Sequence, residues 1–522
     1  MRPSFWTLMP NFTFDAGLLN PLSHGTRESE LTSDQAWLQA MVDAELALTR
    51  ALVDAELAPE WMLAVCDALA DASQFDLGAI AVEARGGGNP VIPFVKHLGR
   101  AAERVRAGAS DHLHVGATSQ DILDTAAMIV ARKVICDLIH QLDSFGADLA
   151  ALADEHRGTV MSGRTLGQQA SPTSFGFVAA GWLDAVLLIV TRLEGIRDSL
   201  PVQLGGAVGN LSVLTEIARA RRSETPASEV LDTVLERFAD HVGLVVPRLS
   251  WHTNRVVISE LASVLAAATG VAGTFALDVS VLSRTEIAEV SERLAPGQGG
   301  SSAMPHKRNP VSAVLITAAA LQTPGLASTL YGSMLAEDQR PSGAWHAEWQ
   351  SLRVLERLTI SAVTGAASLV ARLDVDPDRM RANLDLTDGL VFSERVTTIL
   401  AETVGKTTAF ALVERASQEA FATNRPLQVV LASILITEGC SDELRAQIWA
   451  AFDYEGQPGQ SAGGIDRVVH AFRQRADAVA RRARAATSTD MVEGDSAQVG
   501  APARSNNARS NNARSNNDVR TA

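Results

Sequence analysis

Residues 296–310 (PGQGGSSAMPHKRNP) place two adjacent hydroxyl groups a few positions before an amine. Three glycines within four residues precede Ser301 and Ser302, and Lys307 follows. Glycine leaves the backbone free enough for a loop that closes over a ligand. An amine close to a hydroxyl can lower the pKa of that hydroxyl, so that the oxygen can act as a base. A basic surface loop is the alternative, but Asn309 and Pro310 begin a following apolar helix that would anchor the segment, so we favour a mobile lid over an anion.

Three further segments carry groups that could bind a carboxylate. In the run HVGATSQD, Thr118 or Ser119 can cap a helix whose free N–H groups attract an anion, although taken alone this is an ordinary capping motif. The run GRTL contains Arg164 and Thr165, and the arginine offers a two-pronged donor for a carboxylate, while a surface arginine is the simpler alternative. Arg255, in the run WHTNR, is a second cationic candidate.

Other polar clusters have a structural alternative. The turn at 201–210 (PVQLGGAVGN) either lets the backbone approach a ligand or allows tight helix packing. The run WHAEW at 345–349 is more natural as an anchor in the core, and the run SER at 393–395 as a solvated helix face. The sequence does not identify a general acid, and the candidates are His112, His114, His252 and His346.

The pattern of apolar residues predicts a nearly all-α protein. Apolar residues recur at helical spacing, whereas alternating β-branched runs are scarce. We expect an N-terminal helical domain (1–107), a central domain with a bundle of long helices (108–374) and a C-terminal helical domain (375–486). The predicted helices are 34–56 and 60–71 in the first domain, and 119–157, 174–199, 228–242, 254–290 and 310–334 in the second.

The end of the chain differs from the rest. Apolar periodicity stops at about Thr487, and the run ARSNN occurs three times between 503 and 517. Polar repeats of this kind cannot bury enough apolar surface to fold. We therefore expect a disordered tail over 487–522.

Charge and composition exclude several classes of protein. The 522 residues carry a formal net charge of −15, which argues against a nucleic-acid surface. Three widely spaced cysteines with no metal-ligand spacing predict reduced thiols, a cytoplasmic setting and neither a metal nor a cofactor. The N-terminal stretch is not a convincing signal peptide. The apolar run 261–281 is interrupted by Gly270, Gly273 and Asp278, so we expect a buried bundle helix and no membrane partner.

Together and in this order, the segments GSSAMPHKRNP, TSQD and GRT resemble the signature regions of the fumarase/aspartase superfamily, over about 17–486. The resemblance implies an all-α, three-part fold and a homotetramer with a central core of twenty helices. It also implies four active sites, each built from three subunits. The runs HVGATSQDILDT, NPVIPFVKHL, QLGGAVGN and GAWHAEW resemble most the 3-carboxy-cis,cis-muconate cycloisomerase branch, which includes nitrosuccinate lyases.

The resemblance implies that a base removes a proton next to a carboxylate of a small di- or tricarboxylate substrate, after which the group on the adjacent carbon leaves. The base falls on Ser301, with Ser302 as the alternative. Lys307 and Asn309 fall on positions that bind the substrate carboxylate and stabilise the developing charge. Thr118, Ser119, Arg164 and Thr165 fall on carboxylate-binding positions.

Two departures from the superfamily bear on the substrate. Fumarases and argininosuccinate and adenylosuccinate lyases carry a histidine where this chain has Leu166, which cannot transfer a proton. The cycloisomerase branch has a Glu-His-Glu-Arg run where this chain has Glu337, Asp338, Gln339 and Arg340. We therefore expect a lyase that eliminates nitrous acid from nitrosuccinate to give fumarate. The alternatives are a 3-carboxy-cis,cis-muconate cycloisomerase and, more remotely, a catalytically silent structural relative.

Overall fold

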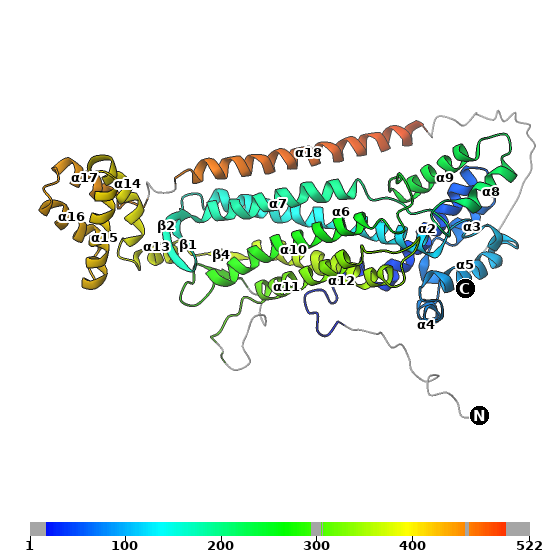
Figure 1. The fold of residues 1–522 in the computed structure, drawn as a ribbon, viewed down its shortest axis with the longest axis horizontal. Coiled ribbons are helices and arrows are strands. Elements are labelled where there is room, and N and C mark those ends of the chain that lie inside the picture. The colour runs from blue at the N-terminus through cyan, green and yellow to red at the C-terminus, as the bar shows by residue number, and fades with distance from the viewer. Residues whose placement is uncertain (1–16, 294–303, 305, 455–458, 497–522) are drawn as a thin grey trace, which may run out of the picture. The chain divides into compact units, whose positions relative to one another are not determined.

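The computed structural model describes residues 17–293, 304, 306–454 and 459–496 (Figure 1). The chain divides into two compact units, Met1–Val469 and His470–Ala522. All elements except the last helix lie wholly within the first unit. In the second unit, the described residues are the C-terminal part of that helix, α18 (Ser461–Ser496).

The first unit is built around five long helices that pack along one another (Figure 1). They are α6 (Ser119–Glu155), α7 (Phe175–Arg197), α10 (Val256–Leu282), α11 (Val311–Gly332) and α12 (Ala344–Val370). The expected all-α class is thereby confirmed. Four of these helices were predicted within a few residues of their observed starts, whereas α12 was not predicted, and α10 ends at Leu282 rather than at 290.

Two of the three interruptions of the apolar run in α10, Gly273 and Asp278, have a packing function. A Cβ atom on Gly273 would lie 2.5 Å from the Cβ of Ala320, so the glycine allows α10 and α11 to approach closely. The carboxylate of Asp278 accepts a hydrogen bond from Trp182 Nε1 of α7 at 2.8 Å. Both interruptions therefore join α10 to its neighbours in the bundle.

Three of the bundle helices, α7, α10 and α11, are long and apolar enough to cross a membrane by length and composition. Half of the most apolar stretch of α7 and of α10 is buried inside the structure, but only 28% of that of α11. The helix α11 therefore presents an uncovered apolar face.

The N-terminal part of the chain surrounds the start of α6. Ser33 starts the longest of these helices, because its side chain accepts a hydrogen bond from the N–H of Ala36 at 3.1 Å. This helix, α2, packs against α6 and α9. The elements of this part are α1 (Arg27–Glu30), α2 (Asp34–Asp54), α3 (Met62–Ala68), η2 (Ala72–Gln74), α4 (Leu77–Gly87), α5 (Val91–Val105) and η3 (Ala109–His112), joined later in the chain by α8 (Ser212–Arg221) and α9 (Ala227–Val242).

Two short antiparallel strand pairs follow the C-terminal ends of bundle helices, and neither was predicted. β1 (Val160–Thr165) pairs with β2 (Gln168–Ser174) through a two-residue turn. β3 (Val290–Glu292) pairs with β4 (Leu373–Val375). The first turn consists of Leu166 (φ +51°) and Gly167 (φ +79°), both in the left-handed region that two-residue hairpin turns require.

The C-terminal helices of the first unit have their own apolar core, formed by buried residues between Leu384 and Tyr454. The elements are α13 (Pro377–Asp385), η4 (Leu390–Phe392), α14 (Ser393–Val404), α15 (Lys406–Thr423), α16 (Leu427–Thr437) and α17 (Asp442–Ala450). The three-domain division stays a prediction. Helix α18 continues to Ser496, past the expected start of the tail at 487, and residues 497–522 lie outside the described residues.

Candidate active site

The start of α6 gathers polar side chains from three separate segments. Thr118 Oγ1 accepts a hydrogen bond from Arg340 Nη2 at 2.6 Å. Ser119 Oγ accepts one from Asn89 Nδ2 at 3.1 Å, and Asn89 in turn caps α5 by accepting from Val91 N–H at 3.0 Å. These groups lie at a helix N-terminus, where backbone N–H groups favour an anion.

Arg340 is a further candidate site residue that the sequence analysis did not select. Its Nε is buried and has no hydrogen-bond partner among the described residues, so the guanidinium has donor capacity left beside Thr118. Its loop is shaped by Glu337, whose Oε1 accepts hydrogen bonds from the N–H and the hydroxyl of Ser342. Arg340 is the last residue of the run 337–340, which departs from the cycloisomerase pattern. This departure is the sequence signal that could have indicated Arg340 as a site residue.

The buried carboxylate of Asp121 organises the surrounding loops. It accepts hydrogen bonds from the N–H groups of Thr118, Gly205 and Gly206, each at 2.9 Å. It also contacts His252 Nε2 at 2.7 Å. The glycine-rich turn at 201–210 therefore gives its first two glycine N–H groups to Asp121, which favours the packing alternative for this turn.

The structure contradicts the expectation that Arg255 binds substrate. Arg255 is 2% exposed, and its guanidinium makes paired hydrogen bonds to Asp124 (2.8 and 3.0 Å) and to Glu348 (2.5 and 3.0 Å). Asp124 also accepts from Trp345 Nε1 at 3.0 Å. Because all five guanidinium donors are engaged, Arg255 is a structural ion-pair residue that joins the first turns of α6, α10 and α12. The WHAEW run is an anchor in the core, as expected.

The four candidate histidines have different surroundings. His252 is 3% exposed, and its Nδ1 is buried without a partner. His112 packs edge-on against Trp61, and burial and the charge of Arg221 lower its pKa. His346 is exposed and packs against two tryptophan rings. His114 lies four residues before Thr118, and its Nδ1 is 2.6 Å from Glu45 Oε1.

The predicted residues Arg164 and Thr165 lie in the β1–β2 hairpin, beyond the other end of α6. Arg164 makes a paired ion contact with Glu289, at 2.9 and 2.5 Å, and Glu289 is fully buried. Asn383 Nδ2 donates to the same carboxylate at 2.8 Å. A substrate carboxylate would have to share Arg164 with Glu289. Thr165 is exposed beside the turn.

The segment expected to form a lid, 296–310, lies between β3 and α11 in the sequence. β3 and the start of α11 lie at the same end of the bundle as the hairpin. Ser301 and Ser302 lie outside the described residues. The side chain of Lys307 is exposed, and Asn309 is half-buried at the start of α11. Glu292 of β3 accepts hydrogen bonds from the N–H groups of Ser312 and Ala313, at 3.2 and 3.0 Å, which fixes the start of α11 against β3.

The predicted site residues thus form two groups in one chain. Thr118 and Ser119 lie at the N-terminal end of α6, whereas Arg164, Thr165, Lys307 and Asn309 lie beyond its C-terminal end. A helix of 37 residues is about 55 Å long. A single chain therefore does not bring the two groups together.

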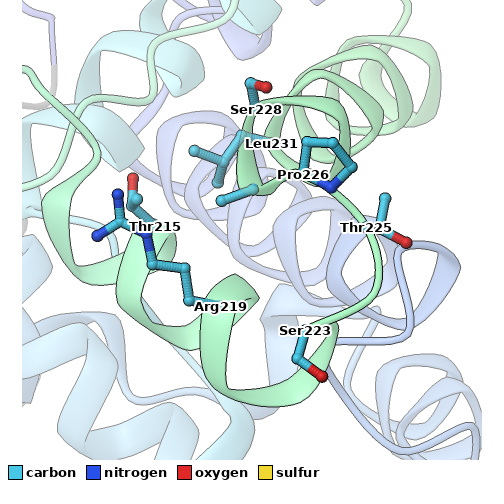
Figure 2. A pocket seen from close by; sticks show the side chains of 8 residues that line it. Thr215, Arg219, Ser223, Thr225, Pro226, Ser228 and Leu231 are labelled. Carbon is cyan, nitrogen blue, oxygen red and sulfur yellow. The ribbon is translucent and has the colours of Figure 1, made fainter.

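A separate pocket of about 580 Å³ lies between α8 and α9 and contains none of the predicted site residues. Figure 2 shows that hydroxyl groups and the side chain of Arg219 surround it. Arg219 pairs with Glu216 at 2.6 Å. In the part of the chain that the structure describes, no group of three or more His, Cys, Asp or Glu side chains could hold a metal ion.

Comparison with known proteins identifies the family. Residues 25–325 match a family model described as lyase. A nitrosuccinate lyase of Streptomyces davaonensis is 44% identical over 87% of this chain and 94% of that protein. A 3-carboxy-cis,cis-muconate cycloisomerase of Bradyrhizobium diazoefficiens is 37% identical over 88% and 98%. The crystal structure of the 3-carboxy-cis,cis-muconate lactonizing enzyme of Pseudomonas putida is 36% identical, with a TM-score of 0.78 over 88% of this chain and 99% of that one. The chain therefore belongs to this lyase family, within the fumarase/aspartase superfamily, and is an enzyme.

Proposed function

We propose that this enzyme catalyses a β-elimination from a substituted succinate to give fumarate, with nitrosuccinate as the substrate and nitrite as the leaving group. The observation that carries the proposal is the tip of the β1–β2 hairpin. Leu166 occupies this tip, fully exposed and with a positive φ that is unfavourable for a leucine. The hairpin therefore offers Arg164 for a carboxylate but no group that could protonate a leaving group.

Nitrite suits a site without an acid at this position. In the proposed reaction, Ser301 takes the proton from the carbon next to a carboxylate, and the electron pair moves into that carboxylate. The pair then forms the carbon–carbon double bond, the bond from carbon to the nitro group breaks, and its electrons leave with nitrite. Because nitrite is a stable anion, it departs without a proton from the enzyme.

The roles of the remaining residues follow from their chemistry. Lys307 and Asn309 bind the carboxylate that takes up the negative charge, so their stabilisation is strongest in the transition state. Thr118, Ser119 and Arg340 bind the second carboxylate at the start of α6. Arg164 and Thr165 reach the substrate from the hairpin.

Subunit assembly would join the two groups of residues. Large apolar side chains are exposed on three bundle helices, which is typical of a surface that another subunit covers. Examples are Leu188 of α7, Leu277 of α10, and Val314 and Leu321 of α11, exposed by 57, 53, 53 and 78%. Five bundle helices in each of four chains would give the twenty-helix core of a homotetramer, whose active sites would each be shared by three subunits.

A second candidate function is that of a 3-carboxy-cis,cis-muconate cycloisomerase, which the similarity to the Bradyrhizobium and Pseudomonas enzymes favours. Against it stands the run Glu337–Arg340, in which Asp338 (φ +56°) and Gln339 replace the histidine and second glutamate typical of that branch. A catalytically silent relative is disfavoured by the intact lid motif.

Incubation with each substrate separates the two activities. We expect nitrosuccinate to give equal amounts of fumarate and nitrite, and 3-carboxy-cis,cis-muconate to remain unchanged. The Ser301→Ala variant should lower nitrite release by orders of magnitude without changing the assembly, whereas Ser302→Ala should retain activity. Loss of the muconate absorbance without nitrite release would instead establish the cycloisomerase, and full activity of Ser301→Ala would assign the base elsewhere.

A further inference from the structure

Glu45 and His114 form a pair for which the proposed mechanism has no role yet. Glu45 is fully buried in the middle of α2, and its Oε1 lies 2.6 Å from His114 Nδ1. Its other oxygen, Oε2, is buried and has no hydrogen-bond partner in the part of the chain that the structure describes. A buried carboxylate with one unpartnered oxygen is costly unless a cation stands next to it. The His114 ring is the group placed to be that cation.

The backbone around His114 is held in an unfavourable conformation. His114 has a φ of +54°, in the left-handed region that residues other than glycine seldom occupy. Two residues later, a Cβ on Gly116 would lie 2.3 Å from the side chain of Leu214, so this segment is tightly fixed against α8. Such conformations persist where contacts enforce them, and they cluster at functional sites.

The charges around His114 connect it to the start of α6. Burial of the ring lowers the pKa of His114, but Glu45 of α2 and Asp121 of α6 outweigh this effect and raise the pKa above its ordinary value. Asp121 is the carboxylate that also holds the N–H of Thr118 and contacts His252. His114 is therefore close to the group that fixes the carboxylate-binding end of α6.

We propose that Glu45 is a positioning residue for this binding site: it holds the His114 ring as a cation, with Nδ1 toward Glu45 and Nε2 left for a carboxylate of the substrate. The inference rests on the proposed function, because it assumes that a carboxylate binds at the start of α6. Arg340 and His114 would then present two cationic groups to that carboxylate.

The test compares wild-type enzyme with Glu45→Gln, His114→Asn and the double variant. Asparagine is chosen because it tolerates a positive φ. Without the charge and the hydrogen bond of Glu45, only Asp121 still opposes the burial that lowers the pKa of His114, so the ring loses its proton at a lower pH than in the wild type. Glu45→Gln should therefore raise KM for nitrosuccinate about tenfold or more at a pH where the wild-type ring is charged, with a smaller effect on kcat, and the difference from the wild type should narrow as the pH falls. His114→Asn should raise KM across the same pH range.

The KM of the double variant should not exceed that of His114→Asn alone, because both changes remove the same interaction. Glu356→Gln is the matched control, since Glu356 is equally buried but lies in α12 outside the site, and its KM should equal that of the wild type. Equal KM profiles for Glu45→Gln and the wild type, or additive losses in the double variant, would overturn the inference. If Glu45→Gln does not fold, His114→Asn must still raise KM, and an unchanged KM overturns the inference.

A measurement without turnover separates this inference from the proposed function. The titration of His114, followed by NMR in the histidine-labelled full-length enzyme, should have a lower midpoint in Glu45→Gln than in the wild type. Absence of nitrite release by the wild type would refute the nitrosuccinate proposal alone. In that case the titration and the binding of fumarate decide the role of Glu45, and an unchanged midpoint or equal fumarate affinity would contradict it.

Discussion

Thr118 and Arg164 lie at opposite ends of helix α6, although both are expected to bind the same substrate. The helix spans 37 residues and is about 55 Å long, far more than the length of a four-carbon dicarboxylate. Hydrogen bonds fix the side chains at each end: Arg340 donates to Thr118 and Asn89 to Ser119, and at the other end Arg164 donates to Glu289. We therefore propose that the catalytic site combines opposite ends of different chains.

Arg340 should be a substrate ligand. Replacing it in Arg340→Met removes a cation whose Nη2 donates to Thr118 and whose Nε has no hydrogen-bond partner within the described ranges. Loss of a charged hydrogen bond of about 1.5–3 kcal/mol should lower kcat/KM about 10- to 100-fold, mainly through KM. Steady-state nitrite release measures this. Arg219→Met is the control, because Arg219 is an exposed arginine of α8, and an equal loss in both variants would contradict the assignment.

Arg255 should contribute to stability rather than to substrate binding. Arg255→Met leaves Asp124 and Glu348 as buried carboxylates without their cation, which typically costs about 3–5 kcal/mol. We expect a clearly lower Tm by calorimetry. Arg50→Met removes an exposed ion pair with Asp67 and should cost at most about 1 kcal/mol. If Arg255→Met had the same Tm as the wild type and only its KM were raised, Arg255 would be a substrate ligand after all.

Glu356 should make the stability of the enzyme depend on pH. It is fully buried in α12, neither carboxyl oxygen has a hydrogen-bond partner among the described residues, and burial raises its pKa to about 8 against the opposing charge of Arg353. The unfolded chain loses this proton near the ordinary value of 4.5. Between these two pH values the folded state holds more protons, so this group lowers stability as pH rises, and the cost is complete above pH 8.

The comparison of Glu356→Gln with the wild type isolates this effect. The Tm difference should be small at pH 5 and should grow in favour of the variant up to pH 8. Glu236→Gln, on the exposed face of α9, should show no such trend. A Tm difference that stays constant from pH 5 to pH 8 would show that Glu356 does not hold its proton in the folded enzyme.

The sequence was sufficient for four of the five bundle helices, whereas α12 was missed and the residues selected for the site stay predictions. Long helices such as α6 follow from the spacing of apolar residues, and their capping residues locate the starts. The β1–β2 hairpin was missed because its short strands lack alternating apolar residues and because Leu166 is unusual at a turn position with positive φ.

The errors in the predicted site come from pairings between residues that lie far apart in the sequence. Arg340 meets Thr118 across 222 positions, and Arg255 meets Asp124 across 131, so residue type and local spacing could not separate a ligand from a buried ion pair. Both arginines look alike in the sequence, and only the fold shows that one has an unpartnered donor and the other has none.

Mixing two impaired variants tests this shared site most directly, with nitrite release measured well below the KM of the wild type so that a loss of substrate binding also lowers the rate. Arg340→Met damages the end of the chain at Thr118, and Lys307→Met damages the other end. If each site draws the two residues from different chains, about one quarter of the sites in randomly reassembled tetramers have both residues intact, from one half times one half. The account predicts recovery of about this fraction of wild-type nitrite release. No recovery above the activity of the separate variants, with mixed tetramers shown to form, would contradict it.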